Sequence, residues 1–163
     1  MKIWKYGDNI DTDMLFPGKY VYTCSIAEEI KPHLLEDLDP NFSKFVKSGD
    51  IILAGKNFGC GSSREQPVIG LKAVGIMAVI AKSFARIFYR SAINQGLILI
   101  ECPDVVDNYN EGDEINLDID AGKIYVSGKE FTFPVLPKEI VEIRNAGGLL
   151  AYTRNKLKEN KKS

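Results

Sequence analysis

Three apolar runs separated by helix-like segments constrain the fold of this chain more than any other feature. Residues 51–54, 76–81 and 97–100 are aliphatic stretches with the length of a β-strand. The segments between them, 68–74 and 84–94, have the composition and apolar spacing of helices. Strands that alternate with helices imply crossover connections, which join parallel strands. We therefore predict an α/β fold built on a central parallel sheet.

The second helix is expected to begin behind a cap at Ser83 and to end at Gly96. Its core-facing residues, which recur at helical spacing, are expected to be Phe84, Ile87, Phe88 and Ser91. Arg86 and Arg90 would then lie on the outer face of the helix. The alternative is that one of these two arginines reaches a ligand site.

Beyond the third apolar run the pattern changes to that of short antiparallel strands. Residues 114–119 alternate in polarity, and glycine turns at 121–122 and 127–128 bound two further strand-like segments. This predicts a C-terminal antiparallel meander. Two helices are expected to follow it, over residues 137–144 and 149–157.

The composition fits a single domain spanning residues 1–163 with a substantial core, because 45% of the residues are hydrophobic. A formal net charge of −1, from 21 basic and 22 acidic residues, gives no electrostatic basis for binding nucleic acid. No segment has the length of a membrane span, and no apolar signal region follows the first residues. We expect a cytoplasmic protein in which residues 155–163 form a frayed basic tail.

The cysteines do not predict a metal site in this chain, because Cys24, Cys60 and Cys102 are far apart in the sequence. Cys60 is a conceivable nucleophile, but such residues usually depend on a histidine relay. The one histidine, His33, lies in a polar stretch and is expected at the surface.

The aspartate-rich stretch of residues 6–13 has two interpretations. Three aspartates at alternate spacings are compatible with calcium, yet the terminal glutamate of a calcium loop is missing. Because Asp, Asn and Thr readily bond their own backbone, we expect a hydrogen-bonded turn here.

The glycine-rich segment of residues 55–66 is the main candidate for a ligand site. It follows a predicted strand and precedes a predicted helix, an order that presents free backbone N–H groups and a positive helix end to an anion. Arg64 adds a forked, permanently charged partner for a carboxylate or a phosphate. Two hydroxyl groups, those of Ser62 and Ser63, lie between the glycines and this arginine.

The same residues also admit a purely structural interpretation as helix caps. Ser62 with Glu65, and Ser63 with Gln66, each have the spacing of a capping box. A proline follows directly, and proline is tolerated in the first helical turn but clashes further in. On this interpretation Ser63 or Arg64 would be the cap.

Three motifs together resemble one protein family. Residues 7–13 with 17–20, residues 55–66 and residues 78–90 are similar to the small subunits of 3-isopropylmalate dehydratase, in the same order along most of residues 1–150. The resemblance implies a single β/β/α domain of the aconitase C-terminal type, which in aconitase is the swivelling domain. It also implies a large-subunit partner that holds a [4Fe-4S] cluster, in a heterodimer or heterotetramer, and no cofactor on this chain alone.

The resemblance also implies a hydro-lyase reaction and assigns roles in it. Ser62 matches the catalytic serine that, as an alkoxide, removes and returns the proton next to a carboxylate. Thr12 and Asp13 match supporting residues of the active site. The substrate-binding residues implied within the glycine-rich segment are Gly61, Ser63 and Arg64. The reaction of the family interconverts 2-isopropylmalate and 3-isopropylmalate in leucine biosynthesis.

Substrate choice is expected to depend on Val21, Tyr22 and Thr23. The similar homoaconitase small subunits carry arginine at the position of Tyr22, where it meets an extra substrate carboxylate. The apolar Val21 better suits an isopropyl group. Small subunits of 2,3-dimethylmalate dehydratase, citraconate hydratase and homoaconitase remain alternatives. A different class, a stand-alone anion- or nucleotide-binding module, is disfavoured because the loop lacks P-loop and dinucleotide spacings.

Overall fold

The core of the fold is the predicted parallel sheet, but it has a fourth strand over Ile3–Lys5 that was not predicted. The computed structural model describes residues 1–160. The strands lie in the order β1-β2-β3-β4, and their bounds are Ile3–Lys5, Ile51–Ala54, Ala78–Ala81 and Leu99–Glu101. In register, Ile52 on β2 lies between Trp4 on β1 and Val79 on β3. Every residue of β2 and β3 is buried, which explains their continuous apolar runs.

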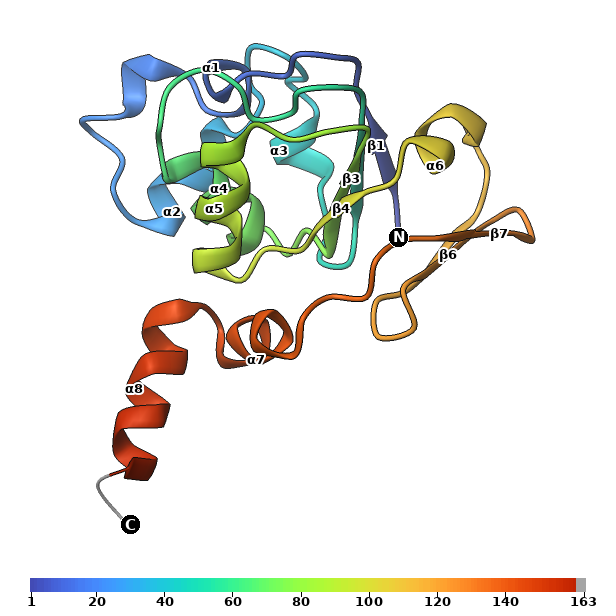
Figure 1. The fold of residues 1–163 in the computed structure, drawn as a ribbon. Coiled ribbons are helices and arrows are strands. Elements are labelled where there is room, and N and C mark those ends of the chain that lie inside the picture. The colour runs from blue at the N-terminus through green and yellow to red at the C-terminus, as the bar shows by residue number, and fades with distance from the viewer. Residues whose placement is uncertain (161–163) are drawn as a thin grey trace.

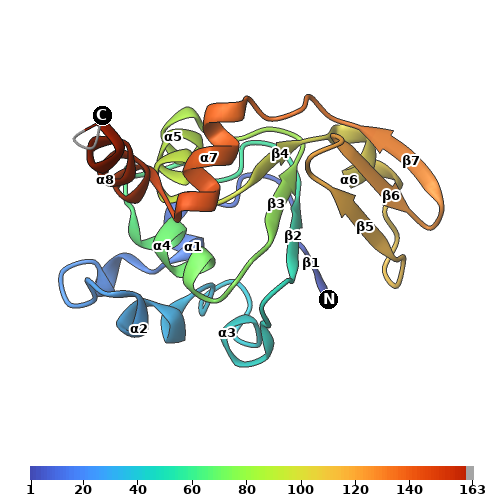
Figure 2. The ribbon, with the colours of Figure 1, turned by 90° about the horizontal axis from the view of Figure 1, so that it is seen from below.

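Different layers cover the two faces of this sheet (Figures 1 and 2). On one face, Ile52 and Val79 join the core that includes residues of α4 (Gln66–Ala73) and α5 (Arg86–Gln95). On the other face, Ile51 and Ile80 join the core formed with α6 and the second sheet. The bounds on that side are Pro103–Asn108 for α6, Ile115–Asp118 for β5, Lys123–Val126 for β6 and Lys129–Thr132 for β7. The antiparallel order β5-β6-β7 confirms the predicted meander.

Short helices complete the layer on the α4 and α5 side. Their bounds are Thr12–Leu15 for α1, Ala27–Ile30 for α2 and Phe42–Phe45 for α3, with 3-10 turns at Gly18–Tyr20 and Lys31–His33. After β7 the chain forms α7 (Lys138–Ala146) and α8 (Leu149–Asn160), which both contact α5 (Figure 2). Helix α8 thus continues through the first part of the stretch expected to fray, residues 155–160. Residues 161–163 lie outside the described part of the chain.

The predicted cap of α4 is wrong, because α4 is preceded by Glu65 rather than by Ser63 or Arg64. No side-chain hydrogen bond caps this helix, so neither serine forms a capping box. Pro67 occupies the first turn, where its missing N–H has no consequence. The two serine hydroxyls are therefore not engaged in starting the helix.

The predicted start of α5 also needs correction. The helix begins at Arg86, and its N-cap, Ala85, has no side-chain hydrogen bond. The Ser83 hydroxyl instead accepts a hydrogen bond from the backbone N–H of Asn57, at 2.9 Å. Gly96 ends the helix with a φ of 76°, as predicted.

The buried face of α5 differs from the prediction at Ile87. Phe88 and Ala92, four residues apart, are buried, whereas the Ile87 side chain is 56% exposed. Residue 87 is rotated by about 100° from residue 88 around the helix axis, which takes it off the core-facing stripe. Arg90 is exposed, as predicted for an outer face. Arg86 is also exposed but lines a cavity beside the glycine-rich loop, which is the alternative considered for one of these arginines.

Candidate active site

The segments that follow β1 and β2 meet at the carboxyl end of the parallel sheet. Because β1 and β2 are adjacent and parallel, both chains leave the sheet at the same edge. The N–H of Thr12 donates to the carbonyl of Cys60 at 2.8 Å, and the N–H of Gly59 donates to the carbonyl of Ile10 at 2.7 Å. These backbone bonds join the aspartate-rich turn to the glycine-rich loop.

Side chains of the aspartate-rich stretch reinforce this junction. The Asp8 carboxylate accepts a hydrogen bond from the N–H of Lys56 at 2.7 Å. Asn57 donates to the Asn9 side chain at 3.0 Å, and both asparagines have left-handed backbone angles, with φ of 59° and 57°. Asn tolerates that conformation better than most residues. The stretch is thus a hydrogen-bonded structural turn, as expected.

An ion pair fixes Arg64 across this junction. Its Nη1 lies 2.6 Å from Oδ1 of Asp13, which α1 carries in its first turn. A Cβ at Gly18 would lie 2.8 Å from that same oxygen and 3.3 Å from Nη1 of Arg64. Residue 18 therefore has to be glycine for the pair to keep this geometry. The Arg64 side chain is 18% exposed, which leaves its guanidinium accessible to a small ligand.

A cavity of about 320 Å³ opens beside this pair. It is lined by Thr12, Gly59, Gly61, Ser62, Arg64, Ala85, Arg86, Ile87 and Phe88. The volume suits a small organic ligand. The lining combines the glycine-rich loop on one side with the start of α5 on the other, and most of its exposed surface is apolar.

One polar atom of the cavity wall has no partner. The Thr12 side chain is 2% exposed, and its Oγ1 makes no hydrogen bond with residues 1–160. A Cβ at Gly61 would lie 3.1 Å from this oxygen, so glycine leaves the hydroxyl uncovered on that side. A buried hydroxyl without a partner costs free energy, which a ligand in the cavity could recover.

The structure brings most of the sequence-predicted site residues together. The cavity is lined by Thr12, Gly61, Ser62 and Arg64. Asp13 is not part of the lining but accepts a hydrogen bond from Arg64. Ser63 is exposed but is not among the residues that line the cavity.

The predicted selectivity residues lie outside the cavity lining. Tyr22 is 98% exposed, and the Thr23 hydroxyl donates to the carbonyl of Tyr20 at 3.2 Å. The carbonyl of Val21 accepts a hydrogen bond from Nε2 of Gln66 at 3.4 Å. This contact holds the segment beside the first residue of α4, at the end of the glycine-rich segment.

A cluster around Glu36, which sequence reasoning missed, anchors the selectivity segment. The Glu36 carboxylate lies 2.7 Å from Nζ of Lys19 and 2.8 Å from Nδ1 of His33, and it accepts a hydrogen bond from the Tyr20 hydroxyl at 3.0 Å. The rings of Tyr20 and His33 stack with centroids 3.7 Å apart. His33 was expected at the surface, but its side chain is only partly exposed and contacts both Glu36 and Tyr20. Burial raises the pKa of the Glu36 carboxyl, but these hydrogen bonds outweigh it and hold the pKa at about 2.

Replacing Glu36 by glutamine is expected to destabilise the chain in a pH-dependent way. A carboxyl whose pKa is depressed on folding contributes stability above its ordinary pKa of 4.5, and this contribution is lost as the pH falls toward about 2. We expect E36Q to lower the free energy of unfolding by ~1 kcal/mol near neutral pH. The difference from the natural chain should shrink below pH 4.5, as measured by urea unfolding at several pH values.

The matched control is Glu28→Gln, because Glu28 accepts one hydrogen bond from Lys31 on an exposed helix surface. That variant should change stability by less than ~0.5 kcal/mol. If the difference in free energy of unfolding between E36Q and the natural chain stayed the same at neutral and acid pH, the stabilisation would not depend on ionised Glu36.

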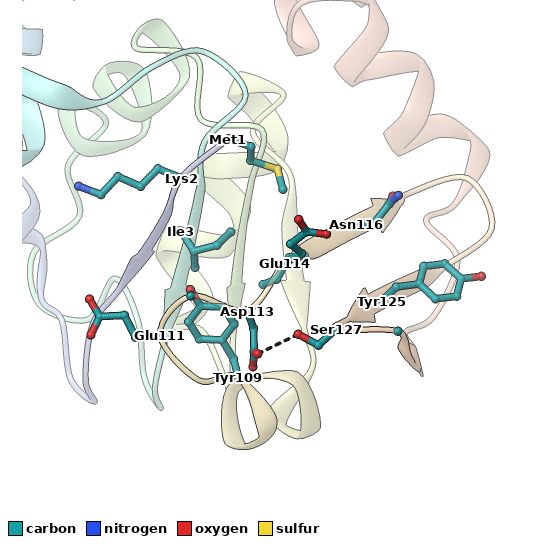
Figure 3. Close-up of a pocket in the computed structure, with 13 residues that line it drawn as sticks. Met1, Lys2, Ile3, Tyr109, Glu111, Asp113, Glu114, Asn116, Tyr125 and Ser127 are labelled. Carbon is teal, nitrogen blue, oxygen red and sulfur yellow. Dashed lines mark hydrogen bonds between the residues drawn. The ribbon is translucent and has the colours of Figure 1, made fainter.

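A larger cavity, about 820 Å³, lies at the opposite end of β1 (Figure 3). Met1, Lys2 and Ile3 form one wall, and residues between Tyr109 and Gly128 form the other. Its serine, Ser127, donates to Asp113 at 2.8 Å, the bond drawn in Figure 3. No histidine, cysteine or arginine is among its lining residues, and it lies away from the carboxyl ends of the strands. Three carboxylates among its lining residues, those of Glu111, Asp113 and Glu114, disfavour an anionic ligand there despite Lys2.

Within residues 1–160, no three His, Cys, Asp or Glu side chains form a group that could hold a metal ion. Cys24 and Cys102 are buried in different apolar clusters, and Cys60 lies in the glycine-rich loop. Over the same described range, no helix combines the length and hydrophobicity needed to cross a bilayer.

Comparison with known proteins places these features in one family. Residues 28–105 match the family model of the aconitase C-terminal domain. The chain is 49% identical to the 3-isopropylmalate dehydratase small subunit of Thermodesulfovibrio yellowstonii, over 96% of this chain and 94% of the relative. It is also 49% identical to the isopropylmalate/citramalate isomerase small subunit of Methanocaldococcus jannaschii, over 98% and 95% of the two chains.

A solved structure supports the same relationship. The crystal structure of 3-isopropylmalate dehydratase (leuD) from Methanocaldococcus jannaschii superimposes with a TM-score of 0.88 at 45% identity. The match covers 99% of this chain and 97% of the crystallised one. The α/β fold with a second antiparallel sheet is therefore the fold of that protein.

Proposed function

Because this chain belongs to the family of 3-isopropylmalate dehydratase small subunits, we propose that it supplies half of the active site that interconverts 2-isopropylmalate and 3-isopropylmalate in leucine biosynthesis. The observation that carries the proposal is the placement of Ser62, Arg64 and the unpartnered Thr12 hydroxyl around one cavity. The hydroxyl of Ser62 lines the same cavity as the Arg64 cation, and neither Ser62 nor Ser63 has a hydrogen-bond partner within residues 1–160. This arrangement suits proton transfer beside a carboxylate.

In the proposed reaction, Ser62 acts as the base. Its oxygen, as an alkoxide, takes the proton from the carbon adjacent to a carboxylate, and the electron pair of that C–H bond forms the alkene. The hydroxyl group leaves from the neighbouring carbon as water, after it takes a proton from an acid that we assign to the large subunit. In the return step the oxygen of water adds to the other carbon, its surplus proton goes back to that acid, and Ser62 returns its proton to the remaining carbon, which gives the isomer.

A serine hydroxyl is a weak acid, so its alkoxide needs stabilisation by nearby positive charge and hydrogen-bond donors. Arg64 lies on the same cavity and offers a guanidinium that is held in place by Asp13. Thr12 has a free hydroxyl on that wall and can donate to the Ser62 oxygen or to substrate. Arg64 is also assigned the binding of one substrate carboxylate.

The proposal assigns the remaining chemistry to a large-subunit partner. A [4Fe-4S] cluster on that subunit would supply the Lewis acid for departure of the hydroxyl group. The residues of this chain form no cluster site within the described range, so no step is assigned to iron held here. We expect the complex to be a heterodimer or heterotetramer of the cytoplasm, and the isolated chain to be inactive.

Citramalate is the second candidate substrate, because a relative that is 49% identical is named for both isopropylmalate and citramalate. Both acids are malates with an alkyl substituent at one carbon. A co-expressed pair of subunits, assayed with isopropylmalate, citramalate, 2,3-dimethylmalate, citraconate and homoaconitate, tests the proposal. Turnover of isopropylmalate supports it, whereas nucleotide binding by the isolated chain without turnover by the pair would favour a binding module.

Replacing Tyr22 by arginine is expected to shift substrate preference toward homoaconitate. A guanidinium at this position can pair with the extra carboxylate, which we expect to change the ratio of kcat/KM values by about tenfold or more. Tyr22 is 98% exposed, so folding should be unaffected. The measurement is competition between the two acids in the assembled enzyme, with Tyr22→Phe as the control. An unchanged ratio would place selectivity elsewhere.

A further inference from the structure

The amino terminus of α5 is open toward the same cavity as Ser62 and Arg64. Its N-cap residue, Ala85, has extended backbone angles and no side-chain hydrogen bond, and the first turn contains no acidic residue. The first intrahelical bond runs from the N–H of Tyr89 to the carbonyl of Ala85. The preceding N–H groups of the first turn therefore have no intrahelical acceptor. Arg86, Ile87 and Phe88, which make up that turn, all line the cavity.

The positive charge of Arg86, on this side of the cavity, is not balanced by an ion pair within residues 1–160. Arg86 is exposed and makes no ion pair or hydrogen bond with any residue in 1–160, whereas Arg64 on the opposite wall is paired with Asp13. The positive end of a ten-residue helix adds to the Arg86 charge. Among the residues that line the cavity, these are the groups left to attract a further anion.

A second observation points to a ligand in the same cavity. The Thr12 hydroxyl is almost fully buried, lines the same cavity and has no hydrogen-bond partner within residues 1–160. Buried hydroxyl groups are normally satisfied, so a polar ligand is expected in the space it faces.

We propose that Arg86 and the free N–H groups of the first turn of α5 bind the second carboxylate of the substrate, and that Ile87 contacts its alkyl group. The inference rests on the proposed function, in which the substrate is a dicarboxylate and Arg64 holds one carboxylate. Ile87 is 56% exposed and lies beside Arg86 on the cavity wall, where an apolar substituent can cover it. The start of α5 thus recognises both the charge and the alkyl group of a 2-alkylmalate.

The first test compares Arg86→Gln with Arg90→Gln in the assembled pair. Arg90 lies one helical turn further along the exposed face of α5 and is not among the residues that line the cavity. We expect R86Q to raise the KM for isopropylmalate by roughly 10- to 100-fold with a smaller change in kcat. R86K should recover part of this loss because it restores the charge without the fork, and R90Q should match the natural chain.

The second test fills the open helix terminus. Ala85→Asp places a carboxylate at the N-cap, where it should raise the midpoint of thermal unfolding by a few degrees and, by competing with substrate, raise KM as well. Ala85→Asn provides the cap without the charge and should raise KM less. A purely structural terminus would give the gain in stability with no change in KM.

The outcomes separate this inference from the proposed function. An active natural pair whose KM is unchanged in R86Q would overturn the inference and leave the function intact. Weaker association of R86Q with the large subunit, with normal KM once the partner is saturating, would also overturn it and assign Arg86 to the subunit contact. A natural pair that turns over none of the five acids would overturn the function, and the inference with it.

Discussion

Replacing Ser62 by alanine is expected to lower the kcat of the assembled enzyme for isopropylmalate by roughly 10³- to 10⁴-fold. The substitution removes the only atom that is assigned to carry the substrate proton. Ser62 is exposed and caps no helix, so the variant should fold and pair with the large subunit as the natural chain does. Steady-state turnover of the co-purified pair gives the activity, and size-exclusion chromatography gives the assembly.

Ser63→Ala is the informative comparison, because Ser63 is also exposed but is not among the residues that line the cavity. Ser63 is expected only to form a hydrogen bond to substrate, so S63A should lower kcat by about tenfold or less. Near-normal turnover by S62A, or a larger loss in S63A, would reject Ser62 as the base. Loss of pairing in S62A would instead indicate a structural role that its exposure does not predict.

The two central strands, β2 and β3, could be predicted because they are buried on both faces, whereas the edge strand β1 buries only Trp4 and was missed. Strands buried on both faces must be apolar throughout, so residues 51–54 and 78–81 are recognisable without any knowledge of their partners. The meander could be predicted for a different reason. Its turns need left-handed backbone angles, which Gly122 and Gly128 adopt with φ of 67° and 84°.

The starts of α4 and α5 could not be predicted, because tertiary contacts decide them, whereas α8 begins at Leu149 as expected. The spacing of Ser62 and Glu65 suits a capping box whether or not the chain is helical there, and α4 begins only at Gln66. The Ser83 hydroxyl bonds to the N–H of Asn57, 26 residues earlier in the chain, and so leaves α5 without a cap. A local pattern contains no information about such a distant competitor.

Some features of the candidate site could likewise be predicted from the sequence, and others depend on tertiary contacts. The Arg64–Asp13 pair joins residues 51 apart in sequence, yet it follows from topology, since adjacent parallel strands release their following loops at one edge. The wall formed by Arg86 and Ile87 does not follow from periodicity, which counted Ile87 as core. Nor does the stacking of Tyr20 on His33, although the spacing of His33 and Glu36 is that of neighbours on one helical turn.

Replacing Arg64 by glutamine is expected to lower kcat/KM for isopropylmalate by about 10²- to 10³-fold, or ~3 to 4 kcal/mol of transition-state stabilisation. The guanidinium is assigned two interactions, with a substrate carboxylate and with the developing Ser62 alkoxide. Because the second exists only during proton transfer, kcat should fall as well as the apparent affinity. Arg64→Lys should recover only part of the loss, since an ammonium group cannot bind a carboxylate with a planar fork.

The variant also leaves Asp13 without its partner, and this carboxylate would then repel an anionic substrate. The double variant R64Q/D13N separates the two effects. If the loss came mainly from the unpaired carboxylate, the second substitution would restore most of the activity, and the direct role of Arg64 would be rejected. If Arg64 itself contacts the reacting groups, D13N will recover no more than about tenfold, the size of an exposed charge effect, because Asp13 is 58% exposed. Steady-state kinetics of the two single variants and the double variant measures this coupling directly.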